Sequence, residues 1–388
     1  MSQLQIFNNL RLGYSLPESL AELVDNSITH NAKNIYVFMY WADDYGKKSC
    51  VMVVDDGDGM TEDELNNKAL GTQDIRVDKG GHDLGLYGLG LKTGSFQYCR
   101  KITIFTKKNS FSSKSLDCET GLFDNLPPCC EIDFVQNQIS KLKQSKSGTI
   151  VIWSDLDRLI TSRSRDTAIN FYNEQDKARK HFKLIYSEFL NSKKVKIFFS
   201  GYNKEHEILA YDPFYKNDNK TKKLEDMKLS FFNGGEMTLS AWIIPKDVQK
   251  ENTNLTRNEM QGIYFYRRDR LISFGGWFGL GAEGKPEEWG INDRYNRLRI
   301  KIELPDEHIQ QWLSSSKNKI TIPEFATKPL FKKISIFRKQ CLEYLKLERQ
   351  DIGNQKNKLN KTSINTDGLS DQDILDIKEY INKIKSKK

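Results

Sequence analysis

Two carboxylates and an amide on one predicted helix form the first group of residues that could do chemistry. In Leu16–Ala32 an apolar residue recurs every three or four positions, which predicts an amphipathic helix. Glu22 and Asn26 are four residues apart, so they share one face of that helix, with Asp25 beside them. A carboxylate next to an amide oxygen suits a general base beside a hard cation such as Mg²⁺. An exposed polar helix face is the alternative interpretation.

A second group is the acidic turn Asp55-Asp-Gly57-Asp-Gly59-Met60, directly after a predicted strand. A carboxylate at a strand end can accept a hydrogen bond from an amino group. Gly57 and Gly59 allow positive φ and a close approach of the backbone to a ligand. An EF-hand does not fit, because with Gly59 at the sixth loop position the first and last ligand positions would be apolar. An ordinary acidic turn stays open.

A third group is glycine-rich and precedes a predicted helix. Gly85-x-x-Gly88-x-Gly90-Leu-Lys92 ends a glycine-rich loop over residues 71–90. Free N–H groups at a helix N-terminus bind phosphate, and a lysine adds positive charge. A dinucleotide-binding turn would need a strand immediately before it, which this loop does not provide.

The pair Gly148-Thr149, which opens a predicted strand, completes a set whose order resembles the GHKL ATPases. These are the gyrase B, MutL, ninety-kilodalton heat-shock chaperone and histidine kinase proteins. The segment Gly85–Cys99, GLYGLGLKTGSFQYC, is most similar to the MORC branch and its bacterial relatives. The resemblance covers about residues 15–155 and extends more loosely to about residue 330.

The resemblance implies a site for ATP and Mg²⁺. Glu22 would polarise the attacking water, Asn26 would ligate Mg²⁺, and Asp55 would accept from the adenine amino group. The other implied nucleotide-site residues are Gly57, Gly59 and Met60 in the adenine pocket, Thr149 beside it, and Gly85, Gly88, Gly90 and Lys92 in a lid over the phosphates. A lysine of the second domain would contact the γ-phosphate. Lys317 is the candidate, with Lys319 as a close alternative.

One departure from the family concerns the acidic turn. Relatives commonly carry Asn or a similar residue where Asp56 stands, so this turn has three carboxylates. We expect Asp56 and Asp58 to face solvent, which leaves the charge of the pocket open.

The elements that must position these residues predict an α/β protein of the α+β sandwich kind. We expect a Bergerat-type ATP-binding domain over residues 1–155, with an irregular polar insertion at 109–147. A transducer-like α/β domain follows over 156–330. A charged helical C-terminal segment at 331–388 contains a linker at 353–367.

Charge is unevenly distributed along the chain. Of 388 residues, 60 are Lys or Arg and 52 are Asp or Glu, which gives a net charge of +8. Residues 1–100 hold 9 basic and 14 acidic residues, so the remainder is strongly basic and permits a polyanionic partner. Two basic clusters could line a nucleic-acid channel or form a solvated sheet face: Arg267, Arg268 and Arg270, and Arg294, Arg297, Arg299 and Lys301.

Two alternatives are disfavoured. A P-loop over Gly279–Lys285 lacks the hydroxyl that would hold Mg²⁺, because Pro286 follows the lysine. A histidine kinase is disfavoured because the nucleotide domain begins almost at residue 1.

The expected function is an ATPase whose lid closure drives formation of a homodimer, acting on DNA as a MORC-like clamp. The alternative is a chaperone-like or scaffold ATPase with a protein client. No apolar run reaches the ~18 residues of a membrane span, and no secretory signal is evident. The six cysteines show no paired spacing, which is typical of a reducing compartment, so we expect a cytoplasmic protein.

Overall fold

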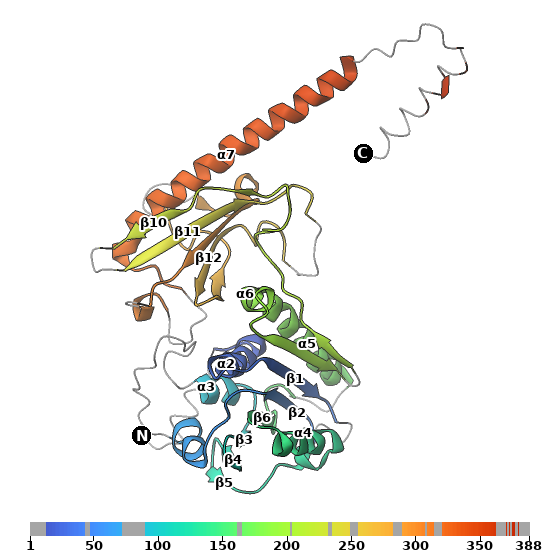
Figure 1. The fold of residues 1–388 in the computed structure, drawn as a ribbon, viewed down its shortest axis with the longest axis vertical. Coiled ribbons are helices and arrows are strands. Elements are labelled where there is room, and N and C mark those ends of the chain that lie inside the picture. The colour runs from blue at the N-terminus through green and yellow to red at the C-terminus, as the bar shows by residue number, and fades with distance from the viewer. Residues whose placement is uncertain are drawn as a thin grey trace. The chain divides into compact units, whose positions relative to one another are not determined.

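The computed structural model describes residues 13–42, 47–71, 90–160, 165–201, 204–231, 235–248, 255–281, 289–306, 309–313 and 320–361, with five isolated positions between 370 and 379. The chain divides into two compact units, residues 1–337 and 338–388. The first unit holds two β-sheets with their helices (Figure 1), which confirms the mixed α/β fold class.

The first sheet has eight strands in the order β5-β4-β3-β6-β2-β1-β7-β8. Only the β1–β7 pair is parallel, and the other neighbours are antiparallel. The strands are β1 (Asn34–Tyr40), β2 (Cys50–Asp55), β3 (Lys101–Lys107), β4 (Phe111–Asp117), β5 (Gly121–Phe123), β6 (Gly148–Ser154), β7 (Lys196–Gly201) and β8 (Lys204–Glu207).

Helices cover both faces of this sheet (Figure 1). One face packs against α2 (Leu16–Thr29), α3 (Gly90–Phe96), α5 (Arg165–Ile185) and α6 (Ser187–Asn191). The other face packs against a 3₁₀ turn (Pro128–Glu131) and α4 (Asp133–Gln144). Successive strand side chains point to opposite faces, so Val37 joins the first core and Phe38 the second.

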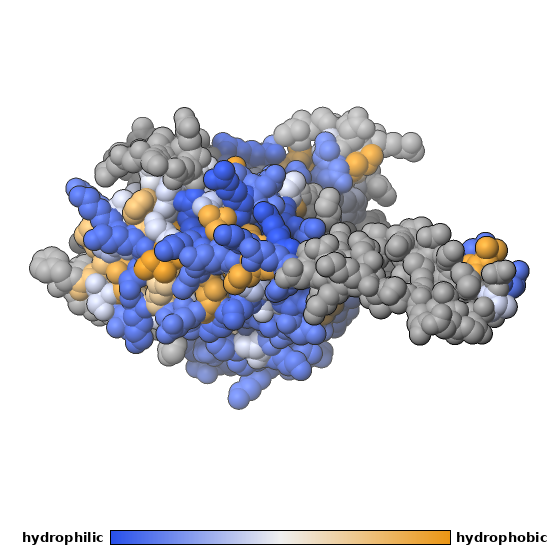
Figure 2. All heavy atoms as spheres, turned by 90° about the horizontal axis from the view of Figure 1, so that it is seen from above, coloured by the Kyte–Doolittle hydropathy of each residue, from blue (hydrophilic) through white to orange (hydrophobic). Residues whose placement is uncertain are grey.

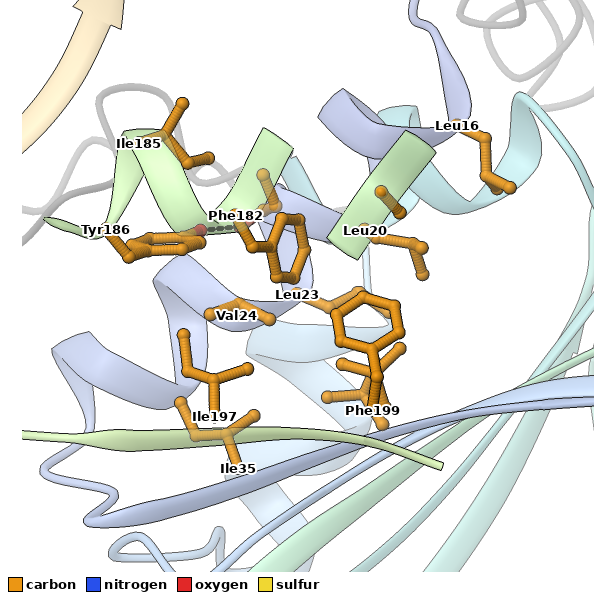
Figure 3. Close-up of a cluster of buried hydrophobic side chains, with 14 of the residues drawn as sticks. Leu16, Leu20, Leu23, Val24, Ile35, Phe182, Ile185, Tyr186, Ile197 and Phe199 are labelled. Carbon is orange, nitrogen blue, oxygen red and sulfur yellow. Dashed lines mark hydrogen bonds between the residues drawn. The ribbon is translucent and has the colours of Figure 1, made fainter. Parts of the chain in front are cut away.

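Helix α2 lies between the sheet and α5 (Figure 3). Its apolar side chains, among them Leu20 and Val24, contact strand residues such as Ile35 on one side and Phe182 of α5 on the other. Ser15 begins the helix as the N-cap of a capping box with Glu18, because each residue binds the other's backbone N–H. The helix that carries Glu22 is therefore held on nearly all sides.

The second sheet has six strands in the order β10-β11-β14-β12-β13, with β9 paired to β11. Its strands are β9 (Lys222–Lys223), β10 (Met227–Ser230), β11 (Glu236–Ile243), β12 (Gly262–Arg267), β13 (Arg270–Phe274) and β14 (Leu298–Glu303). The helix α7 (Glu324–Lys361) follows. Within the first unit, Phe325 of α7 packs edge-on against Phe231 and Trp312.

Two sequence expectations about regular structure are wrong. Residues 109–147 are not irregular, because they contain β4, β5 and α4. The sequence does indicate α4 through the spacing of Val135, Ile139 and Leu142, which places them on one helix face. All three are buried in the second hydrophobic core. Residues 353–361 are not linker but the end of α7, since the one glycine there costs only about 1 kcal/mol in a helix.

The expected domain boundary at residue 155 falls inside the first sheet's span. Strands β7 and β8 add to the edge of that sheet through β1, so the sheet continues to Glu207. A domain boundary placed after Glu207 would keep all eight strands of the first sheet in one domain. The boundaries of the three domains stay predictions.

Among the coloured residues of the face shown in Figure 2, the surface is mainly hydrophilic, with smaller hydrophobic areas in between. All six cysteines are buried, and none of them forms a disulfide. Among the helices that the structure describes, none has an apolar stretch long enough to cross a membrane.

We predict that Phe182→Ala strongly destabilises the first unit, because Phe182 is fully buried between α2 and β7. Such truncations cost about 3–5 kcal/mol of unfolding free energy. Ile169→Ala on the same helix is the control, since Ile169 is 59% exposed and the expected change is within about 0.5 kcal/mol. Guanidinium unfolding followed by circular dichroism measures both. Equal effects of the two variants would contradict the assigned packing of α5.

Candidate functional site

Helix α2 buries its carboxylates. Glu22 and Asp25 are 3% and 2% exposed, and Asn26 is half-buried. The alternative of an exposed polar helix face is therefore wrong for both acids. A carboxylate is buried in this way only where other groups compensate for the loss of water.

The last turn of α2 reaches the acidic turn. Ser27 Oγ donates to Asp55 Oδ2 at 2.9 Å, and Gly57 N donates to Asp55 Oδ1 at 2.9 Å. Burial raises the pKa of Asp55 to about 6, while these two hydrogen bonds act in the opposite direction. Thr149 of β6 lies opposite Asp55 in the sheet register. The carboxylate at the end of β2 is thus oriented by Ser27 and Gly57, and a backbone hydrogen bond from Thr149 also lowers its pKa.

Close backbone approach explains the glycines of the acidic turn. A Cβ on Gly59 would lie 1.9 Å from Lys107 O, and the residue has φ +67°. A Cβ on Gly57 would lie 2.6 Å from His30 O. Met60 N donates to Thr106 Oγ1 at 2.8 Å. Gly57, Gly59 and Met60 therefore form a turn fixed against β3 and the end of α2.

The two extra carboxylates of the turn are exposed, and both are hydrogen-bonded. Asp56 Oδ1 accepts from Lys33 N at 2.7 Å and from Asn34 N at 2.8 Å. Asp58 Oδ2 accepts from Asn31 Nδ2 at 2.8 Å. Their oxygens therefore hold the connection between α2 and β1, and the charge of Asp56 adds to the effect of burial in raising the pKa of Asp55.

The glycine-rich motif meets the first motif at α3. A Cβ on Gly90 would lie 2.0 Å from Glu22 Oε2, and one on Gly94 would lie 3.3 Å from Glu22 Cβ. The helix is also held to the sheet, since Trp153 Nε1 donates to Ser95 Oγ at 2.7 Å. Gly90 is required because no side chain fits between the start of α3 and Glu22.

Lys92 is buried and its ammonium group donates to the carbonyl of Gly71. Burial lowers the pKa of Lys92 to about 8. The lysine thus ties α3 to the beginning of segment 71–90, and its contact with phosphate stays a prediction.

Several predicted residues lie outside the described part of the chain. These are Gly85 and Gly88 of the lid, most of segment 71–90, Lys317 and Lys319, and Gly284 and Lys285 of the disfavoured P-loop.

Neither interpretation of the arginine clusters holds, because most of these side chains form internal contacts. Arg267, Arg297 and Arg299 are buried, while Arg294 is exposed. The acceptors are Asp306 for Arg267 and Arg268, Asp25 for Arg270, and the backbone oxygens of Ile244 and Asn296 for Arg297 and Arg299. Lys301 pairs with Glu188 at 3.5 Å. The sequence spacing could not reveal the partners of Arg267, Arg270 and Arg297, since they come from distant parts of the chain.

Sequence reasoning missed four residues at or near the site: Ser27, Thr106, Tyr186 and Arg270. Ser27 carried a signal, because it falls on the apolar stripe of α2, where a hydroxyl needs a partner. Tyr186 OH donates to Ala21 O at 3.0 Å and to Asp25 Oδ1 at 2.8 Å. Its contact with α2 spans more than 160 residues, and no local pattern points to it.

The donor set of α2 fits a cation that is held partly by a substrate. Glu22 and Asn26 offer oxygen atoms, which hard cations such as Mg²⁺ prefer. Among the described residues, no three His, Cys, Asp or Glu side chains gather as a metal site. Mg²⁺ commonly binds through one or two protein ligands together with substrate phosphates. The oxygen donors of α2 could therefore hold Mg²⁺ together with substrate phosphates.

Comparison with known proteins agrees with this geometry. Residues 14–149 match a family described as Histidine kinase-, DNA gyrase B-, and HSP90-like ATPase. A 108-residue segment is 34% identical to MORC family CW-type zinc finger protein 3 of Mus musculus. That segment is 27% of this chain and 11% of the relative, so the match spans a small fraction of that protein. The predicted resemblance to the GHKL ATPases is confirmed over residues 14–149, and the similarity to a MORC family protein supports the predicted likeness to that branch.

Proposed function

We propose that the chain binds ATP with Mg²⁺ and hydrolyses it, with α2 as the catalytic helix. The observation that carries this proposal is that α2 joins three motifs. Its Glu22 lies against Gly90 of α3, and its Ser27 binds Asp55 at the end of β2. These contacts support a site in which one buried element connects the groups proposed to activate water, bind phosphate and bind adenine.

Binding of the adenine ring depends on Asp55, whose carboxylate accepts a hydrogen bond from the adenine amino group. Gly57 and Gly59 keep the turn free of side chains, Met60 contributes apolar surface, and Thr149 supports the site beside Asp55. The phosphates lie under the lid formed by Gly85, Gly88 and Gly90, with Lys92 nearby.

Hydrolysis rests on the opposite end of the site. Mg²⁺, when bound with the nucleotide, would neutralise charge on the phosphates. Glu22 orients the attacking water and accepts its proton, and Asn26 supplies an amide oxygen to the metal. Lid closure over the phosphates drives homodimer formation, and Lys317 or Lys319 contacts the γ-phosphate.

DNA is the first candidate client, on the resemblance to the MORC branch. A protein client is the alternative, and one observation favours it: most arginines of the expected nucleic-acid channel bind internal acceptors. Pull-downs over a salt series separate the two, because phosphate contacts make affinity fall steeply with salt. A cytoplasmic location stays a prediction.

Glu22→Gln should retain ATP binding and lose turnover, because the amide cannot accept the proton of water. General bases contribute about 10²–10⁴ in rate, so kcat should fall at least about 100-fold. Glu18→Gln is the control, since it removes the same charge one turn earlier and glutamine also completes a capping box. A steady-state phosphate-release assay measures both. Near-parental turnover of Glu22→Gln would remove Glu22 from the mechanism.

Asp55→Asn should weaken nucleotide binding itself, because its amide can present a donor where the adenine amino group needs an acceptor. Hydrogen bonds to charged groups contribute about 1.5–3 kcal/mol, so Kd should rise about 10- to 100-fold. Asp58→Asn in the same turn should bind ATP normally, since its carboxylate only accepts from Asn31. Calorimetry with ADP measures both.

The same site should respond to pH. With its pKa raised to about 6, Asp55 is ionised at pH 7 and largely protonated at pH 5, where it loses acceptor capacity. ADP affinity of the parent protein should therefore fall between pH 7 and pH 5 more than that of Asp55→Asn. Parallel curves for the two proteins would show that Asp55 does not contact the base.

One of Lys317→Ala and Lys319→Ala should lose turnover while ATP still binds, because its charge would stabilise the γ-phosphate in the closed state. The same variant should not dimerise with a non-hydrolysable ATP analogue, as measured by size-exclusion chromatography with light scattering. The other lysine variant is the control. Parental behaviour of both would mean that neither lysine completes the site.

A further inference from the structure

We propose that Arg270 of the second sheet is a positioning residue for ATP hydrolysis, acting on the catalytic helix through Asp25. This inference rests on the proposed ATPase function and adds to it a residue that neither the motifs nor the family resemblance indicates. Its basis is a buried ion pair between Arg270 of β13 and Asp25 of α2, two residues that are 245 positions apart in the sequence.

The ion pair is short and largely shielded from water. Arg270 Nε lies 2.8 Å from Asp25 Oδ1 and 2.7 Å from Oδ2. The side chains of Arg270 and Asp25 are 12% and 2% exposed. Tyr186 OH also donates to Asp25 Oδ1, and the guanidinium lies 5.8 Å from the Tyr186 ring centre. Asp25 is therefore fixed from two directions, by an arginine and by a tyrosine.

A tight hairpin places Arg270 at this position. Arg267 and Arg270 pair across β12 and β13, and the two residues between them have positive φ, +50° for Arg268 and +67° for Asp269. Such a turn matches the twist of the strands but is uncommon for residues other than Gly, Asn and Asp. At the turn Arg268 binds Asp306, whereas the ion pair of Asp269 with Lys194 is exposed. The strand pairing of Arg267 with Arg270 therefore sets the position from which Arg270 contacts α2.

The position of Asp25 explains why this contact matters for chemistry. Asp25 directly precedes Asn26 and lies three residues after Glu22, so a rotation of α2 about its axis moves all three. A pocket of about 160 Å³ lies between α2 and β13, with Glu22 and Arg270 both in its wall. The next residue, Leu271, belongs to the same buried core as α2. Movement of the second sheet would therefore reorient the residues that act on the water and the metal.

A purely structural role for the ion pair makes a different prediction. Loss of a contact that only stabilises the fold lowers the folded fraction but leaves kcat per folded molecule unchanged. A positioning residue lowers kcat with little change in nucleotide affinity, since Arg270 binds Asp25 whereas the acidic turn is held through a different residue, Ser27.

The experiment is a double-mutant cycle of Arg270→Met and Asp25→Asn, with kcat and ADP affinity measured for each folded protein. Misplacement of reacting groups by about 1 Å can cost 100-fold, so Arg270→Met should lower kcat at least about tenfold. Its ADP affinity should stay within about threefold, and the double variant should be no worse than the worse single one. Arg270→Met alone leaves the Asp25 carboxylate buried without its cationic partner, which can impair folding. The double variant removes both charges, so its kcat can be measured even if the single variant folds poorly.

Lys194→Ala is the matched control, because it removes an exposed ion pair to the same hairpin and should leave kcat unchanged. Hydrogen exchange of residues 16–29 gives a readout that does not depend on turnover. It should accelerate in Arg270→Met and not in Lys194→Ala. The inference would be overturned if Arg270→Met kept the kcat of the parent protein. It would also be overturned if the kcat losses of the two single variants multiplied in the double variant, or if hydrogen exchange in α2 were unchanged.

Failure of the proposed function is distinguishable from failure of this inference. An inactive parent protein would overturn the proposed function and the role of Arg270 with it. An active parent, with inactive Glu22→Gln and fully active Arg270→Met, would overturn the role of Arg270 alone.

Discussion

The burial of α2 is the constraint on which the rest of the site depends. This helix packs between a sheet and a second helix, so its polar side chains can remain buried only where other elements offer partners. Ser27 meets Asp55 of β2, and Asp25 meets Tyr186 and Arg270. Each of these hydrogen bonds satisfies a buried polar group of α2. Each also connects α2 to another element: β2, α5–α6 or β13.

Steric limits at two glycines complete this arrangement. Gly90 lets α3 approach Glu22, and Gly59 lets the acidic turn approach the carbonyl of Lys107. A side chain at Gly90 would push α3 away from Glu22, and one at Gly59 would push the acidic turn away from β3. These two glycines therefore serve the packing of protein against protein.

Ion pairs connect the second sheet to this core. Asp25, Glu188 and Lys194 of the first sheet's layer bind Arg270, Lys301 and Asp269 respectively. Basic residues that form a cluster along the sequence are thereby distributed among separate internal contacts. The net positive charge of the chain consequently says less about a polyanionic partner than the composition suggests.

The sequence by itself determined the order of the motifs, the amphipathic period of α2 and the α/β class, because these depend on local spacing. It indicated Glu22, Asn26 and Asp55 as candidate residues for the same reason. The apolar spacing of α4 lies within a mainly polar segment, so the helix was not predicted. The sequence also did not show that β7 and β8 belong to the first sheet, because that depends on the pairing of β7 with β1. Only the tertiary structure decided which charges are buried together. Arg270 and Asp25 are distant in the chain, and an ion pair between them depends on how two sheets pack, which no local pattern encodes.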